Sequence, residues 1–433
     1  AAQHDLLAVL RLVDAGKLRA NEESHRATGA SLQAIAQVLQ GGDFYPPEKD
    51  EERGDPGPIK AFAWPLLLRN AGLVNLSGSK LQLTPAGRKA LTAPPHETIR
   101  PIWKQWLDTT ALDEFSRVNA VKGQGGKGKR QMTAVAERRS VIVETLAECP
   151  SDEWISVDEL SRFMRATGRG FQVTHNPWSL YISDPQYGSL GYDGYHDWNI
   201  LQGRYILAFL FEYAATLGLI DVAFMHPAGA RRDYHELWGT DDLPFLSRYD
   251  GLTHFRINAL GAWCLGQAEH YVPAPPEARQ ALKVLPTLEI VAVEQLQPSD
   301  ALFLDLFAEK TSDTAWKIQP ARLLQAVDAG HSVSEVEAFL SAQSGGSLPD
   351  TVAAFFKDMA ERASCLTDRG PALLIEAADP SLAQRLVNDA RLRTFCLLAG
   401  ESHIVVPAQH ESAFRRALRE LGHALPPAQP DKR

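Results

Sequence analysis

The sequence predicts a mixed, mainly α fold in which two repeated α+β units precede a small α/β domain. The repeat is the main reason for this prediction. In both copies a helix ends at a glycine followed by two apolar residues, and an alternating strand later leads into a helix that contains a glycine. These elements occupy residues 71–74 and 81–87 in the first copy, and residues 217–220 and 255–261 in the second.

Helix, hairpin and helix in this order predict a winged helix. Gly72 and Gly218 have the position of residues just past a helix end, and the alternation at Leu81 and Leu83 is typical of a half-buried strand. A winged helix most often binds nucleic acid and otherwise holds proteins together. The two copies therefore direct the functional analysis toward binding.

The length of 433 residues suits about three domains. We expect a first winged-helix unit, a helical connector with a basic Gly/Lys linker, a second winged-helix unit with a long aromatic insertion, and an α/β domain. Their expected bounds are residues 1–95, 96–136, 137–272 and 284–425. In the last domain, strands at 288–293, 315–319, 372–376 and 394–407 alternate with helices. Within the first unit, Pro65 places the expected start of a helix near Trp64.

The composition favours a cytoplasmic, nucleoid-associated protein without a membrane partner. No run of about 18 apolar residues is present for a membrane span, and the first residues lack the pattern of a signal peptide. The cysteines lie far apart, which favours buried thiols over a metal site. They are Cys149, Cys264, Cys365 and Cys396.

The charge is uneven along the chain. A formal net charge of −9 argues against indiscriminate coating of nucleic acid. Residues 121–140 nevertheless carry six basic residues and one acid, whereas the chain from Val284 onward carries twenty acids and fourteen Lys and Arg. We therefore expect nucleic-acid contacts in the first two thirds of the chain and protein docking in the last third.

The candidate DNA contacts are basic residues at the repeats and in the linker. The second expected wing carries an arginine pair, which either grips phosphates or forms ion pairs with Asp233, Asp241 or Asp242 in a solvated loop. The full set is Lys60, Arg69 and Lys80 in the first unit, Lys122, Lys127, Lys129 and Arg130 in the linker, and Arg231 and Arg232 in the second unit.

Enzymatic motifs are weak or absent, so the sequence predicts a binder without catalytic residues, metal or cofactor. Residues 123–129 match the spacing of a phosphate-binding loop, but Arg130 replaces the hydroxyl residue that would bind magnesium. The aromatic insertion at 171–213 either stacks bases or forms core, and core is favoured. A zinc site would draw on His196, Asp197, His226 and His235, whose spacing is not typical of ligands, and a hidden nuclease centre would depend on His196 or Asp197.

The C-terminal third resembles a known family. Residues 318–330, 335–340, 348–352 and 416–422 look like the helicase-associated domain at the N-terminus of XPB-type DNA helicases. The resemblance implies a role in DNA transactions beside a separate motor protein, since the chain lacks every ATPase motif.

Two functional hypotheses follow. In the first, a non-enzymatic protein of bacterial type binds duplex or forked DNA through two winged helices, in repair, transcription or defence, together with a helicase or nuclease. In the alternative, the chain is a scaffold whose winged helices bind proteins rather than DNA. The basic linker favours the first hypothesis, and the net negative charge favours the second.

Overall fold

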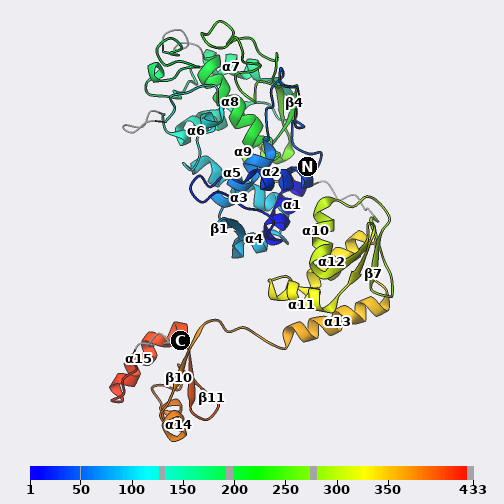
Figure 1. Cartoon of the computed structure of the whole chain (residues 1–433), viewed down its shortest axis with the longest axis vertical. Helices are drawn as coiled ribbons and strands as arrows, with labels where there is room; N and C mark the ends of the chain where they lie inside the picture. Colours follow the sequence, from blue (N-terminus) through cyan, green and yellow to red (C-terminus); the bar gives the residue numbers. More distant parts are fainter. Residues whose placement is uncertain (49, 126–131, 192–197, 274–279, 427–433) are drawn as a thin grey trace. The chain divides into compact units, whose positions relative to one another are not determined.

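The computed structural model describes residues 1–48, 50–125, 132–191, 198–273 and 280–426. Its contacts divide the chain into two compact units, Ala1–Phe356 and Lys357–Arg433. Both units mix helices with small antiparallel sheets (Figure 1). The division falls inside the α/β domain that we expect at residues 284–425.

The first repeat contains four helices and a short hairpin. In chain order they are α1 (Ala2–Asp14), α2 (Gly29–Val38), α3 (Lys60–Asn70), β1 (Val74–Ser77), β2 (Lys80–Leu83) and α4 (Pro85–Ala90). The segment after α1 joins the hairpin as a third strand-like edge. There the Ala20 N–H donates to the Ser79 carbonyl at 2.8 Å, and the Leu81 N–H donates to the Leu18 carbonyl at 3.1 Å.

The second repeat has the same order of elements. It comprises α6 (Val135–Glu148), β3 (Trp154–Ser156), α7 (Val157–Ala166), a long buried helix, β4 (Ile220–Phe224), β5 (Leu252–Ile257) and α9 (Ala259–Leu265). The buried helix consists of α8 (Arg204–Ala208) between two π-helical stretches, η3 (Asn199–Gly203) and η4 (Phe209–Ala214). Its three strands pair in the order β3-β5-β4, so β5 occupies the centre as β2 does in the first repeat.

The two repeats share their local geometry at the glycines found in the sequence. Gly72 and Gly218 follow helix ends with φ of 68° and 70°, as predicted. A Cβ on Gly87 would lie 2.0 Å from the Leu73 carbonyl oxygen, and one on Gly261 would lie 1.9 Å from that of Leu219. A side chain at either position would therefore collide with backbone. The sequence repeat thus reflects an equivalent packing of the last helix against the hairpin.

A connector joins the repeats through buried ion pairs. It contains α5 (Pro95–Asp108) and the 3-10 turn η1 (Glu114–Arg117). Glu114 accepts hydrogen bonds from Arg139 on α6 at 2.6 Å and from the Tyr205 hydroxyl on α8 at 2.8 Å. Arg139 also donates to the main-chain carbonyls of the connector, including that of Trp106 at 2.6 Å. The connector is therefore fixed to the second repeat.

Arg117, at the other end of η1, bridges both repeats. Its Nε donates to Glu212 on η4 at 3.2 Å, and Nη2 donates to the carbonyl of Pro58 just before α3 at 2.9 Å. The guanidinium also lies 3.6 Å from the centre of the Phe62 ring on α3. Burial acts to lower the pKa of Arg117, but the negative charge of Glu212 together with the interactions of Tyr249 and Tyr213 outweighs it, and the pKa is raised. Arg117 therefore stays charged inside the core.

The start of α3 differs from the sequence prediction. The helix begins at Lys60, and Pro65 lies inside it rather than in its first turn. The Asp43 carboxylate accepts hydrogen bonds from the N–H groups of Ile59, Lys60 and Ala61 at 2.9–3.2 Å. The Asp43 carboxylate thus pairs with N–H groups that have no partner within the helix, and α3 begins one turn before the predicted start near Trp64. Sequence reasoning did not foresee this contact between distant residues.

The remainder of unit 1 is a four-stranded antiparallel sheet with helices. Its sheet has the order β6-β7-β9-β8. The elements are β6 (Leu282–Val284), β7 (Glu289–Ala292), α10 (Pro298–Phe307), β8 (Ala308–Ser312), β9 (Ala315–Ile318), α11 (Pro320–Asp328) and α12 (Val333–Gln343). Polar contacts join this part to α1, because Arg11 pairs with Asp300 at 3.2 Å and His331 contacts Asp14 at 2.7 Å. The next helix, α13 (Asp350–Ser364), contains the boundary between the two units.

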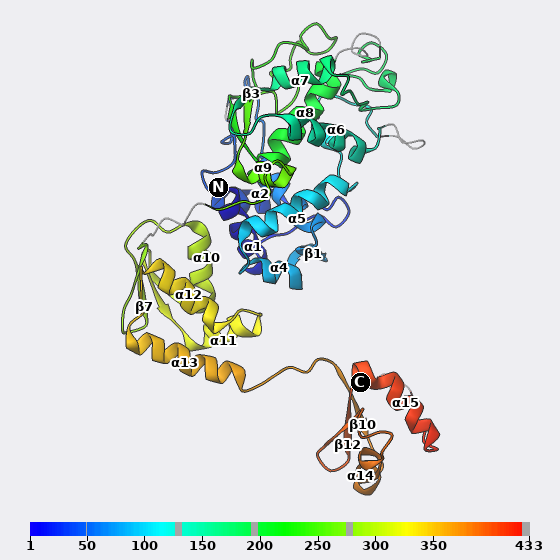
Figure 2. The same ribbon diagram turned by 180° about the vertical axis from the view of Figure 1, so that it is seen from behind.

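Unit 2 has its own small core between one sheet and two helices (Figure 2). Its elements are β10 (Ala372–Glu376), α14 (Pro380–Asn388), β11 (Leu397–Ala399), β12 (His403–Pro407), the 3-10 turn η5 (Ala408–His410) and α15 (Glu411–Glu420), with sheet order β10-β12-β11. The single strand predicted at 394–407 is instead a hairpin. Gly400, with φ of 67°, provides the left-handed turn that reverses the chain.

The helices and the cysteines bear on two further sequence predictions. Among the helices of the described residues, none has the length and apolar character to cross a membrane. Cys264 and Cys396 are buried as expected and Cys149 is half-buried, whereas Cys365 is exposed, so the prediction of buried thiols is wrong for Cys365. Cys365 follows the end of α13, where no core covers it.

We expect Arg139→Met to destabilise the fold by about 3–5 kcal/mol, because the Glu114 carboxylate would remain buried without its cation. The double variant Arg139→Met/Glu114→Leu should recover most of this loss. Urea unfolding followed by circular dichroism measures both. Arg162→Met at an exposed pair, 3.7 Å from Glu159, is the control and should change stability by less than about 1 kcal/mol. Additive losses in the double variant would contradict the expectation.

We also expect stability to fall as pH rises through the titration of His331. Hydrogen bonds to Asp14 and Glu335 raise its pKa to about 9 from 6.5, although burial opposes them. The protonated form therefore stabilises the fold fully below about pH 6.5, and this contribution, at most about 3 kcal/mol, is lost as pH approaches and passes 9. Urea unfolding from pH 6 to 10 tests this. A His331→Gln variant should lack this component, and parallel curves would contradict it.

Candidate nucleic-acid interface

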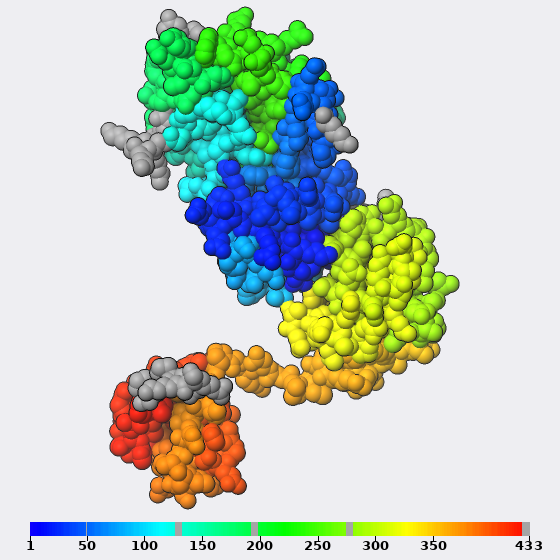
Figure 3. Space-filling view, viewed as in Figure 1, coloured from blue at the N-terminus to red at the C-terminus, as the bar shows by residue number. Residues whose placement is uncertain are grey.

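The helix before the hairpin is buried in both repeats. All residues of α3 from Lys60 to Leu68 are buried, as is every residue of η4. The two helices contact each other, and Phe44, in the segment between α2 and α3, packs on Phe211 with ring centres 4.4 Å apart. The space-filling view shows the two repeats in contact (Figure 3). Neither helix therefore presents a face that could enter a DNA groove in this structure.

Lys60 is accordingly part of this interior. It is 8% exposed, and its ammonium lies 5.0 Å from the centre of the Phe44 ring. Arg69, by contrast, is half-buried at the end of α3 and donates to the His25 carbonyl at 3.0 Å. Of these two predicted contacts, only Arg69 reaches the surface.

Lys80 belongs to a basic surface around the first hairpin, which we call the hairpin patch. Lys80 is exposed and pairs across the strands with Arg19, whose guanidinium contacts the Ser79 hydroxyl at 3.3 Å. The loop that holds His25 connects this pair to Arg69. The basic members of the hairpin patch are Arg19, Arg26, Arg69 and Lys80, and Glu22 and Glu23 are exposed in the same loop.

A second basic surface is a cleft of about 360 Å³ between α7 and the long β4–β5 insertion. We call it the arginine cleft. Four arginines line it, together with two aspartates and small or polar residues. Its lining is Asp158, Ser161, Arg162, Arg165, Asn199, Ala230, Arg231, Arg232 and Asp233.

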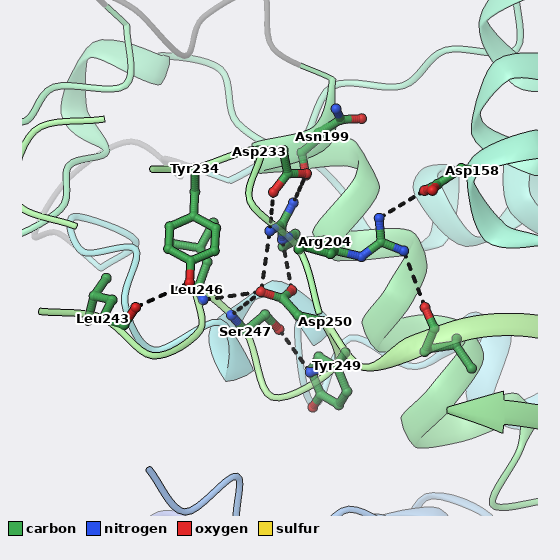
Figure 4. Close-up of polar contacts among 12 residues, drawn as sticks. Asp158, Asn199, Arg204, Asp233, Tyr234, Leu243, Leu246, Ser247, Tyr249 and Asp250 are labelled. Atoms are coloured by element: carbon green, nitrogen blue, oxygen red, sulfur yellow. Dashed lines mark hydrogen bonds and ion pairs between the residues drawn. The ribbon is translucent and has the colours of Figure 1, made fainter. Parts of the chain in front are cut away.

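A buried network holds one wall of the arginine cleft in place (Figure 4). Arg204 on α8 is 1% exposed and donates to both Asp233 oxygens at 2.6 and 2.7 Å. Its Nε donates to Asp250 at 2.9 Å, and Asp250 in turn accepts from the N–H groups of Leu246 and Ser247 at 3.1 Å. The insertion is thus anchored at two points to the long buried helix.

The charges of this network are set by burial and by Arg204. Burial raises the pKa of the Asp250 carboxyl above its ordinary value, against the opposing charge of Arg204. At Asp233 burial also acts to raise the pKa, but the hydrogen bonds and charge of Arg204 outweigh it, so the pKa is lowered. Asp233 is therefore ionised at neutral pH and forms an ion pair with Arg204.

The two predicted arginines of the second repeat have different roles. Arg231 pairs with Asp158 on α7 at 2.8 Å and donates to the Leu252 carbonyl at 3.2 Å, with its side chain 16% exposed. Arg232 is exposed at the mouth of the cleft. Arg231 therefore closes the cleft against α7, and Arg232 is the one that can reach a ligand.

Sequence reasoning missed Arg162 and Arg165, which are exposed on α7 and line the same cleft. The helical periodicity of the sequence could have identified them. Residues 158, 162 and 165 recur at spacings of four and three, which places them on one polar face of an amphipathic helix. Only the fold showed that the β4–β5 insertion lies opposite that face.

The basic linker is described only in part. Lys122 is exposed, its Nζ donates to the Asn119 carbonyl at 2.6 Å, and its backbone pairs with Tyr181. Its neighbour Gly123 leaves no room for a side chain, because a Cβ would lie 1.9 Å from the Ser179 carbonyl oxygen. The predicted contacts Lys127, Lys129 and Arg130 lie outside the described residues.

The aromatic insertion divides into core and surface. Tyr205 and Tyr213 are fully buried, and Tyr213 stacks on Trp106 with ring centres 4.1 Å apart. Trp178 and Tyr187 are 57% and 67% exposed. The interpretation as core therefore holds for the helical part and for Phe171 and Trp198, which pack against the same core, but not for Trp178 and Tyr187. Of the weighed zinc ligands, His196 and Asp197 lie outside the described residues, and the described ones contain no cluster suited to a metal ion.

One comparison with known proteins bears on the C-terminal part. Residues 282–400 match the helicase conserved C-terminal domain. No curated protein matches the chain. The matched region begins at β6 and ends after β11, so it includes residues of both units. This match supports the expected helicase-associated domain in its general form and suggests a helicase-related role for this region.

We expect substitutions of the buried and of the exposed arginines around the cleft to differ in how much stability they cost. Arg204→Ala should cost at least about 3 kcal/mol, because Asp250 would be left buried without a cation. Arg232→Ala should change stability by less than about 0.5 kcal/mol, since its side chain is exposed. Urea unfolding of both variants tests this assignment, and equal losses would show that Arg232 is structural.

Proposed function

We propose that this chain is a non-enzymatic DNA-binding protein that acts beside a helicase or nuclease in a DNA transaction. The observation that carries the proposal is the arginine cleft, where Arg162, Arg165 and Arg232 converge from α7 and the β4–β5 insertion. Guanidinium groups match the geometry of phosphate oxygens and are the usual ligands of a nucleic-acid backbone. Such contacts supply affinity without reading sequence.

Both repeats, in our proposal, are winged-helix units. Support comes from the chain order of helix, strand, helix, helix, strand and strand, with the last strand at the sheet centre. In the first repeat the segment around Arg19 takes the place of the first strand. The hairpins β1–β2 and β4–β5 would then be the wings, and the β4–β5 insertion an enlarged second wing.

The mode of binding follows from burial. In a helix-turn-helix protein the second helix of the motif enters the major groove. Here the corresponding helices, α3 and the helix of residues 199–214, pack together in the interior. We therefore place the DNA contacts on the hairpin patch and the arginine cleft, with the linker residues Lys122, Lys127, Lys129 and Arg130 as further phosphate contacts.

The helicase connection rests on the match at residues 282–400. The resemblance of this region to the helicase-associated domain of XPB-type helicases supports a role beside a motor protein. The acidic balance of the chain from Val284 onward suits protein docking better than phosphate binding. We therefore assign partner binding to the C-terminal part and DNA binding to the repeats.

The alternative, a protein-interaction scaffold, is favoured by one observation. Mutual burial of α3 and η4 removes the surface that winged helices use most often for DNA. In that case both repeats would serve only to present partner-binding surfaces. The DNA-binding proposal requires instead that the two basic surfaces suffice for affinity.

Fluorescence anisotropy with duplex and forked DNA over a salt series tests the proposal. We expect Arg162→Ala/Arg232→Ala and Arg19→Ala/Lys80→Ala each to weaken binding to all sequences. The salt slope should fall by about one unit for each basic side chain removed from a phosphate. The double variant Lys104→Ala/Lys283→Ala, at exposed lysines outside both surfaces, is the matched control. Absence of salt-dependent binding by the unmodified protein at low ionic strength would favour the scaffold.

A further inference from the structure

Two exposed aromatic rings lie together on the surface of the second repeat. Tyr187 is 67% exposed and Trp238 is 53% exposed, and their ring centres are 6.0 Å apart at an angle of 46°. Large rings exposed as a pair are unusual, because each would gain free energy by burial. The pair therefore marks a binding surface.

The loops that carry the two rings are held by polar contacts. The Asp184 carboxylate accepts from the Gln186 and Tyr187 N–H groups at 2.7 and 3.2 Å, which fixes the turn around Tyr187. The Ser183 hydroxyl donates to the Gly239 carbonyl at 3.1 Å and so joins this turn to the loop of Trp238. The surface is preorganised, which lowers the entropic cost of binding a ligand.

The tryptophan shares the β4–β5 insertion with the arginine cleft. Trp238 follows Arg232 by six positions in the sequence, so their Cα atoms lie at most about 20 Å apart. Thr240 reinforces this part of the insertion, because its hydroxyl contacts the Tyr234 and Leu237 carbonyls at 3.1 and 2.7 Å. At most about six nucleotides of a strand would therefore lie between Arg232 and Trp238.

We propose that the Tyr187–Trp238 pair stacks unpaired bases of a single nucleic-acid strand whose phosphates occupy the arginine cleft. This inference rests on the proposed function and specifies its substrate as DNA with a single-stranded segment. Aromatic faces beside a positively charged groove are the usual means of binding single strands without sequence preference. A duplex cannot use the pair, because its bases are stacked inside the helix.

The four arginines of the cleft favour a nucleic acid over a protein as the occupant. The exposed acids Glu236, Asp241 and Asp242 beside Trp238 require the phosphates to lie in the cleft and not at the rings. A peptide that fills an aromatic surface needs no row of arginines beside it. The arginines on α7 and on the insertion instead match the regular negative charge of a strand, and the rings match its bases. The phosphates of the ligand therefore have counterparts in the arginine cleft and its bases have counterparts in the Tyr187–Trp238 pair.

The test is fluorescence anisotropy of the full chain with labelled oligothymidylate and with a labelled duplex, at one low salt concentration. We expect Tyr187→Ala/Trp238→Ala to weaken oligothymidylate binding at least about fivefold, and to change duplex binding less than about twofold. Trp238→Phe, which keeps an aromatic face, should retain most of the affinity for oligothymidylate.

Trp154→Ala is the matched control, because Trp154 is 49% exposed on β3 and belongs to neither loop. It should leave oligothymidylate binding unchanged. Equal effects of Tyr187→Ala/Trp238→Ala on single strand and duplex, or no effect on either, would overturn the stacking site while DNA binding itself stands. Failure of the unmodified protein to bind either DNA would instead refute the proposed function.

Discussion

The buried turn Glu114–Arg117 is the constraint on which the rest of unit 1 depends. Its two charged ends hold different partners: Glu114 engages Arg139 and Tyr205, while Arg117 reaches Glu212 and also the backbone before α3. Because each charge is buried, each needs a partner of opposite charge at hydrogen-bonding distance. The turn thereby fixes the connector, α3 and the long helix of the second repeat relative to one another.

This arrangement has a direct functional consequence. The same contacts that join the repeats bury α3 and η4 against each other, so the helices most often used for DNA recognition become core. Binding must then use what the core leaves outside, namely hairpins, the insertion and α7. Buried ion pairs also position the binding surface. Arg204 pairs with Asp233 and Asp250, and these contacts hold the insertion that forms one wall of the arginine cleft and carries Trp238.

Arginine therefore serves two purposes in this molecule, and burial separates them. Arg117, Arg139 and Arg204 each meet a carboxylate in the interior and are committed to stability. Arg162, Arg165 and Arg232 are exposed around one cleft. The sequence alone does not separate these two groups, because an arginine in a sequence does not reveal whether its side chain is buried or exposed.

The sequence by itself determined the repeat and most helices and strands. Gly72, Gly87, Gly218 and Gly261 marked equivalent positions, because glycine adopts a left-handed turn with the least strain and because any Cβ at Gly87 or Gly261 would collide with backbone. Tertiary structure decided what the sequence could not: that Asp43 caps α3 from a distance, that Lys60 is buried, and that Tyr187 meets Trp238. Local periodicity fixes an element and its apolar face, whereas contacts between distant segments arise only when the whole core is packed.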